Sequence, residues 1–73
     1  MRKNKQHIGR GIEHFRKKMG WSQRKLASKA DVAHSTIAGI EREDFEPSLK
    51  TLKKISNALQ VPISHLFLEI EYS

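Results

Sequence analysis

Basic side chains crowd the first 29 residues of this sequence. Ten lysines and arginines lie there against one acid, Glu13, and the whole chain carries a formal net charge of +6. The balance reverses over residues 41–46, where four acids surround Arg42. This uneven charge is typical of a surface that binds a polyanion, although a basic tail or a solvated helix face gives the same totals.

A second candidate surface is small and carries hydrogen-bonding groups. The chain from Ala33 or His34 to Arg42 reads as a short helix whose buried side carries Ile37 and Ile40, one turn apart. The opposite face consists of small, mostly uncharged residues, which are His34, Ser35, Ala38, Gly39 and Arg42. A solvated helix face normally carries Lys and Glu, so this composition indicates the close approach of a large partner.

Apolar spacing and capping residues predict the elements that must position these surfaces. A stripe at three- and four-residue spacings predicts a helix over 8–19, and Ser22 is a good N-cap for a helix over 23–30. The most amphipathic helix begins near Ser48 and runs to residue 59, and residues 63–67 read as a last short helical turn. Isolated helices shorter than about 12–15 residues are marginal in water, so the longer elements must hold the two short ones.

The two ends of the chain are expected to lie outside the packed domain. Residues 1–7 read as a basic mobile arm, favoured as a solubilising tail over an arm that contacts phosphate or the minor groove. Residues 68–73 alternate apolar and polar side chains, which is typical of a strand. Either this tail frays, or its apolar residues form a dimer contact with those just before it. The candidate dimer residues are Ile63, Phe67, Leu68, Ile70 and Tyr72.

Composition argues against several classes of protein. The chain has no cysteine, which removes disulfides and Cys-based zinc sites, and no apolar run reaches the roughly 20 residues that span a bilayer. Its 73 residues leave little room for a shielded catalytic cavity, and the four histidines have no metal-site spacing. We therefore expect a cytoplasmic protein that is no enzyme, with no cofactor, no metal, no membrane contact and no small-molecule substrate.

The joint spacing of landmarks from Ile8 to Phe67 resembles the helix-turn-helix domain of the phage-repressor/Cro type, the XRE family. The landmarks at the helix junctions are Ile8-Gly9, Arg16, Gly20, Ser22-Gln23, Leu26-Ala27, Ser35-Thr36-Ile37, Ile40-Glu41-Arg42, Pro47-Ser48-Leu49, Leu52, Ala58-Leu59, Val61 and Leu66. The resemblance implies a compact, all-α, five-helix repressor-like domain over residues 8–67. It also implies that the third helix enters the major groove of double-stranded DNA.

The resemblance assigns roles to individual positions. Arg16 and Glu41 fall where the family has a structural ion pair. The positions that read base edges are His34, Ser35, Ala38 and Gly39, although for Ser35 solvation of the helix N-terminus is favoured nearly as much as base contact. The positions that contact the DNA backbone are Ser22, Gln23, Arg24, Thr36, Arg42 and Lys50.

This sequence departs from the family pattern in and around the two short helices. Asp31 stands where the turn usually has Gly, and Ala33 stands where Ser or Thr often caps the third helix. Gly39 removes a side chain that would read a base. In the acidic link 43–46, Phe45 is expected to fold back onto the core, and most of the link's charge would repel phosphate.

Two functions from different classes fit these observations. The first is a sequence-specific transcriptional regulator, a repressor, that binds a palindromic operator as a homodimer. The alternative is a protein-interaction module on the same scaffold, such as an antitoxin or the partner of another regulator. The basic first half of the chain favours DNA, whereas Gly39 and the acidic link favour the alternative.

Overall fold

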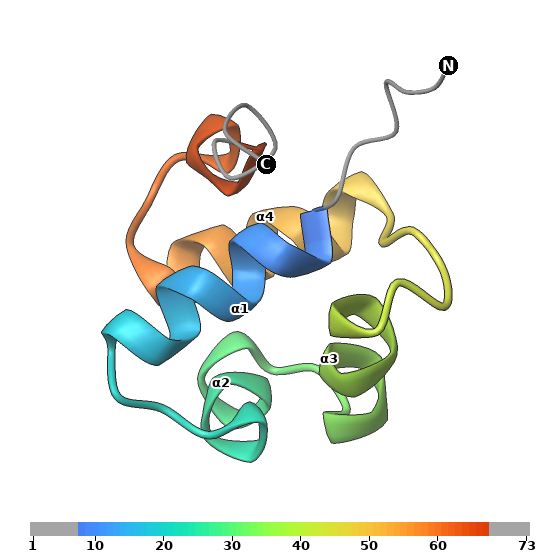
Figure 1. Cartoon of the computed structure of the whole chain (residues 1–73), viewed down its shortest axis with the longest axis horizontal. Coiled ribbons are helices and arrows are strands. Elements are labelled where there is room, and N and C mark those ends of the chain that lie inside the picture. Colours follow the sequence, from blue (N-terminus) through green and yellow to red (C-terminus); the bar gives the residue numbers. More distant parts are fainter. Residues whose placement is uncertain (1–7, 68–73) are drawn as a thin grey trace.

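A computed structural model describes residues 8–67, which form a small helical domain (Figure 1). The elements are α1 (Ile8–Lys18), α2 (Gln23–Ala30), α3 (His34–Glu41), α4 (Leu49–Leu59) and the 3₁₀ helix η1 (Ile63–Phe67). The all-α class is confirmed, but the count of five α-helices is wrong. The last element is five residues long, and its His65 N–H donates to the carbonyl of Pro62, an i→i+3 bond typical of short 3₁₀ segments.

The core takes apolar side chains from every element. Its largest fully buried side chains are Ile12, Leu26, Ile37, Ile40, Ile55 and Leu66. α1 packs against α3 and η1, while α2 packs against both α3 and α4 (Figure 1). The predicted stripe of α1 extends one residue too far, because the helix ends at Lys18 and Met19 is 40% exposed. None of the helices in residues 8–67 is long and apolar enough to cross a membrane.

Two of the helices begin with a serine cap. The Ser22 hydroxyl accepts a hydrogen bond from the Lys25 N–H at 3.0 Å, and Ser48 accepts from the Thr51 N–H at 3.1 Å. Ala33 precedes α3 and supplies no such bond. Since a missing cap typically costs about 1 kcal/mol, α3 must be held by its packing and by the contacts of its last residue.

All four α-helices in the described part of the chain end in a Schellman motif. Beyond the last turn a residue adopts a left-handed backbone, and its N–H and the next N–H donate to carbonyls of that turn. The left-handed residues are Gly20 (φ 76°), Asp31 (φ 60°), Glu43 (φ 64°) and Gln60 (φ 61°). After α1, α2 and α4 the next residue is Trp21, Val32 or Val61, each packed against the core. After α3 it is Asp44.

Candidate functional site

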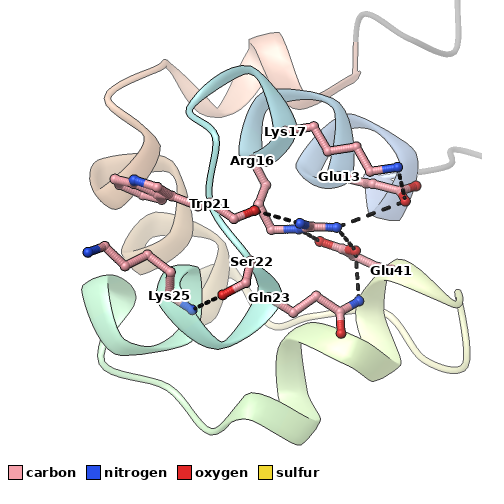
Figure 2. Close-up of polar contacts among 8 residues, drawn as sticks. All are labelled: Glu13, Arg16, Lys17, Trp21, Ser22, Gln23, Lys25 and Glu41. Atoms are coloured by element: carbon pink, nitrogen blue, oxygen red, sulfur yellow. Dashed lines mark hydrogen bonds and ion pairs between the residues drawn. The ribbon is translucent and has the colours of Figure 1, made fainter.

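An ion pair buried between the helices fixes α3 relative to α1. Arg16 donates from Nε to Glu41 Oε2 at 2.7 Å and from Nη2 to Oε1 at 3.0 Å. Its Nη1 donates to the carbonyl of Trp21 at 2.7 Å, in the loop that leads into α2 (Figure 2). The two charged side chains are only 9% and 4% exposed. The pair that the family resemblance implies thus joins the end of α3 to α1 and to the start of the α2 segment.

Two further side chains extend this network. Gln23 Nε2 donates to Glu41 Oε1 at 2.9 Å, so the first residue of α2 is tied to the last residue of α3. Glu13 lies 4.0 Å from Arg16 Nη2 and 3.1 Å from Lys17 Nζ (Figure 2). The hydrogen bond to Glu41 raises the pKa of Arg16, and this exceeds the opposing effect of burial. The guanidinium therefore stays charged within the fold.

The bond between Gln23 and Glu41 is not predicted by the sequence. The family resemblance puts Gln23 at a DNA-backbone position, whereas the structure engages its side-chain amide within the domain. The two residues are 18 positions apart, so no periodicity connects them. The only signal was that one helix starts with an amide and the next ends with a carboxylate.

The outward face of α3 is formed by a narrower set of residues than predicted. His34 and Ser35 are exposed, Ala38 is half-buried on the same face, and Thr36 is half-buried to one side. Ser35, Ala38 and Arg42 recur at three- and four-residue spacing, and the backbone of Arg42 keeps helical angles (φ −78°, ψ −6°). These three residues therefore line one side of the helix, with His34 at its open N-terminal end.

The expectation that Gly39 lies on the open outward face is wrong. Gly39 is buried, and a Cβ placed there would lie 2.5 Å from Cε2 of Phe45 and 3.2 Å from its Cζ. The position is to one side of the outward stripe, and the link after α3 turns back over it. Phe45 does fold back, but onto Gly39 rather than into the core, and it stays 49% exposed.

Exposed basic side chains lie on the elements that precede and follow α3 in the chain. Arg24 and Lys25 are exposed in the first turn of α2, and Lys50 is exposed in the first turn of α4. Lys29 Nζ lies 6.0 Å from the ring centroid of Trp21, whose half-buried side chain packs against the core. The first turns of α2 and α4 therefore present positive charge.

The predicted dimer residues divide between described and undescribed parts of the chain. Ile63 packs against the core, and Phe67 lines a groove of about 150 Å³ together with Ile8, Pro47 and Leu52. Leu68, Ile70 and Tyr72 lie outside the described residues, as does the basic arm over residues 1–7. Within residues 8–67, no three His, Asp or Glu side chains are grouped so that they could hold a metal ion.

Comparison with known proteins places this arrangement in a family. The helix-turn-helix model HTH_3 matches residues 12–66. Over 60 residues the chain is 42% identical to the HTH-type transcriptional regulator SinR of Bacillus subtilis. This match covers 81% of the chain and 54% of SinR. The chain is also 39% identical over 57 residues to the immunity repressor protein of Bacillus phage phi105. That match covers 78% of the chain and 40% of the repressor.

The fold also matches a solved structure with DNA. The crystal structure of SinR, a master regulator for biofilm formation, in complex with DNA superposes with a TM-score of 0.78 and 42% identity. The match covers 81% of this chain and 95% of that one. The chain spans about half the length of the curated relatives it matches.

Proposed function

Because the chain belongs to the HTH_3 helix-turn-helix family of XRE-type regulators, we propose that it binds double-stranded DNA as a transcriptional repressor. The observation that carries this proposal is the outward face of α3, where exposed His34 and Ser35 lie on a helix held in place by the buried Arg16–Glu41 pair. In helix-turn-helix proteins the second helix of the motif lies in the major groove. Here that helix is α3, and SinR and the phi105 repressor supply the functional parallel.

Base reading in this proposal falls to the N-terminal half of α3. Recognition helices contact base edges mainly through their N-terminal residues, which here are His34 and Ser35. An imidazole or a hydroxyl can hydrogen-bond to base edges, and the Ala38 methyl group can contact a thymine methyl. Gly39 drops out of this set because the Phe45 ring covers it.

Backbone contacts fall to the ends of the neighbouring helices. Ser22 and Arg24 at the start of α2 and Lys50 at the start of α4 offer charge and free hydrogen-bonding groups to phosphate. Gln23 keeps its side-chain amide on Glu41, so its contribution comes from its main-chain N–H. Thr36, beside the outward face of α3, and Arg42, at the C-terminal end of that face, would contact the DNA backbone as well.

We further propose that two copies bind a palindromic operator. A two-fold dimer would set two α3 helices about 34 Å apart, one turn of DNA. The contact would use Ile63 and Phe67 with the apolar residues that follow, up to Tyr72. A second copy would cover the groove beside Phe67.

The test of the proposal is selection of bound sequences from a random DNA pool, followed by titration at several salt concentrations. We expect a two-fold symmetric consensus, and a linear fall of log Kobs with log salt whose slope is about −0.9 per phosphate neutralised. Equal affinity for all sequences, or affinity independent of salt, would exclude sequence-specific DNA binding. No retention of DNA even at low salt would favour the protein-interaction alternative.

Replacement of His34 by Ala tests the base-reading role. On the selected site, the loss of one base contact is expected to weaken binding by about 1–3 kcal/mol, while binding to random DNA changes little. The matched control is His14→Ala, which removes an exposed imidazole from α1 instead of α3. An equal loss on specific and random DNA would assign His34 to the phosphate backbone.

A further inference from the structure

The last residue of the outward stripe of α3 is bound to a carboxylate of its own chain. Arg42 donates from Nε and from Nη2 to Asp44 Oδ2, at 3.0 and 2.8 Å. Both side chains are well exposed, at 66% and 52%. Arg42 is the one cation on the stripe that also contains Ser35 and Ala38, so the carboxylate neutralises the positive charge of this part of the surface.

The position of Asp44 is fixed by the way α3 ends. The Glu43 N–H donates to the carbonyl of Ile40, and the Asp44 N–H donates to that of Gly39, both at 2.9 Å. At the equivalent position after α1, α2 and α4 the chain has an apolar residue that packs against the core. After α3 the same Schellman geometry carries a carboxylate instead, and it turns toward the arginine two residues earlier.

A phosphate that binds the Nε–Nη2 edge of Arg42 would use the same donors that now hold the Asp44 carboxylate. Both ligands are anions that accept hydrogen bonds from the guanidinium edge, and one edge cannot serve both at once. An exposed ion pair is weak, so DNA can displace the carboxylate, but the displaced charge remains next to the phosphates. We infer that Asp44 competes with a DNA phosphate for Arg42 and thereby lowers the affinity of the α3 surface for DNA. This inference rests on the proposed function.

The test compares four variants with the unmodified protein by fluorescence anisotropy on the selected DNA site over a range of salt concentrations. Asp44→Asn keeps the shape of the side chain and removes its charge. We expect about two- to fivefold tighter binding, the range of an exposed ion pair, and a salt slope that is steeper by about 0.9, equivalent to one added phosphate contact. Because both side chains are exposed, the thermal midpoint should stay unchanged.

Two controls separate the competition from a general charge effect. Glu46→Gln removes the same charge from the same link and leaves the Arg42–Asp44 pair in place, so its gain should be smaller and its salt slope unchanged. When Asp44→Asn is added to Arg42→Gln, the gain in affinity over Arg42→Gln alone should shrink to that of Glu46→Gln, because the group for which Asp44 competes is gone.

The outcomes that overturn the inference are distinct. Weaker binding by Asp44→Asn would mean that the carboxylate orients Arg42 toward DNA. A gain equal to that of Glu46→Gln, or one that persists without Arg42, would reduce Asp44 to a general negative charge. Failure of the unmodified protein to bind DNA at any salt concentration would overturn the proposed function and this inference together. Tight wild-type binding with no effect of Asp44→Asn would overturn only the inference.

Discussion

Replacing Glu41 by Ala is expected to lower the thermal midpoint by more than about 12 °C. The change removes the two carboxylate contacts, at 2.7 and 3.0 Å, from an Arg16 side chain that is only 9% exposed in the folded domain. Breaking a buried ion pair by removing one partner typically costs about 3–5 kcal/mol, and each kcal/mol shifts the midpoint of so small a domain by about 4–8 °C. The free energy of unfolding for 73 residues is about 4–11 kcal/mol, so much of the stability is lost.

Two further variants test this prediction, and the thermal midpoints of all variants are measured by circular dichroism. Glu13→Ala removes the other acid beside Arg16, but that carboxylate is 41% exposed and 4.0 Å away, so the expected loss is at most about 1 kcal/mol. The double variant Arg16→Met with Glu41→Leu should be more stable than Glu41→Ala, since it leaves no unpaired buried charge. Equal midpoints for Glu13→Ala and Glu41→Ala would mean that the pair does not hold the fold.

The raised pKa of Arg16 determines the pH range over which the Arg16–Glu41 pair stabilises the fold. A base with a raised pKa in the folded state contributes its full stabilisation below the unfolded pKa and loses it only as the pH rises through the folded value. On the arginine side, the pair is therefore insensitive to pH throughout the physiological range. Since an arginine stays protonated at these pH values with or without Glu41, the difference in thermal midpoint between Glu41→Ala and the unmodified protein should stay the same from neutral to moderately alkaline pH.

Local chemistry in the sequence was sufficient to predict most of the fold. Ser22 and Ser48 marked two helix starts because a serine hydroxyl accepts the free N–H groups of a first turn, and both bonds form. The amphipathic helix predicted from near Ser48 to residue 59 forms as α4, and its Ile55 is fully buried. These features depend on residues a few positions apart, which is the distance over which helical periodicity applies.

The parts that could not be predicted depend on contacts between segments. Gly39 looked like an outer residue on the helix alone, but the path of the link after α3 places the Phe45 ring over it. Gln23 was predicted at a DNA-backbone position, but the packing of α3 places Glu41 Oε1 2.9 Å from its Nε2. The Arg16–Glu41 pair spans 25 positions and followed from the family resemblance, not from spacing. The outward surface is therefore smaller, and its supporting network larger, than the sequence indicated.

Gly11→Ala is the substitution with the second large expected effect. The sign of its stability change differs between what the sequence predicts and what the structure predicts. From helix propensity alone, Ala at this position in α1 should stabilise the domain by about 1 kcal/mol. In the fold, however, a Cβ at Gly11 would overlap the carbonyl oxygen of Leu66 and lie 2.7 Å from its carbonyl carbon and 3.0 Å from its Cα. These are main-chain atoms of η1, so they cannot move aside as a flexible side chain does.

Accommodating the methyl group must separate α1 from η1 and disturb Leu66, which is fully buried in the core. Overpacking typically costs about 1–3 kcal/mol, and partial withdrawal of a buried leucine adds to it, so we expect a net loss of at least about 2 kcal/mol. The midpoint of a thermal melt should fall by at least about 8 °C. Gly20→Ala is the matched control, because no heavy atom lies within 4 Å of that Cβ and only the positive φ of 76° opposes it. A gain in stability for Gly11→Ala, or a loss no larger than for Gly20→Ala, would show that α1 and η1 are not in close backbone contact. A larger loss for Gly11→Ala than for Gly20→Ala would mean that glycine occupies position 11 because of this backbone contact, and not because of the helix propensity of α1.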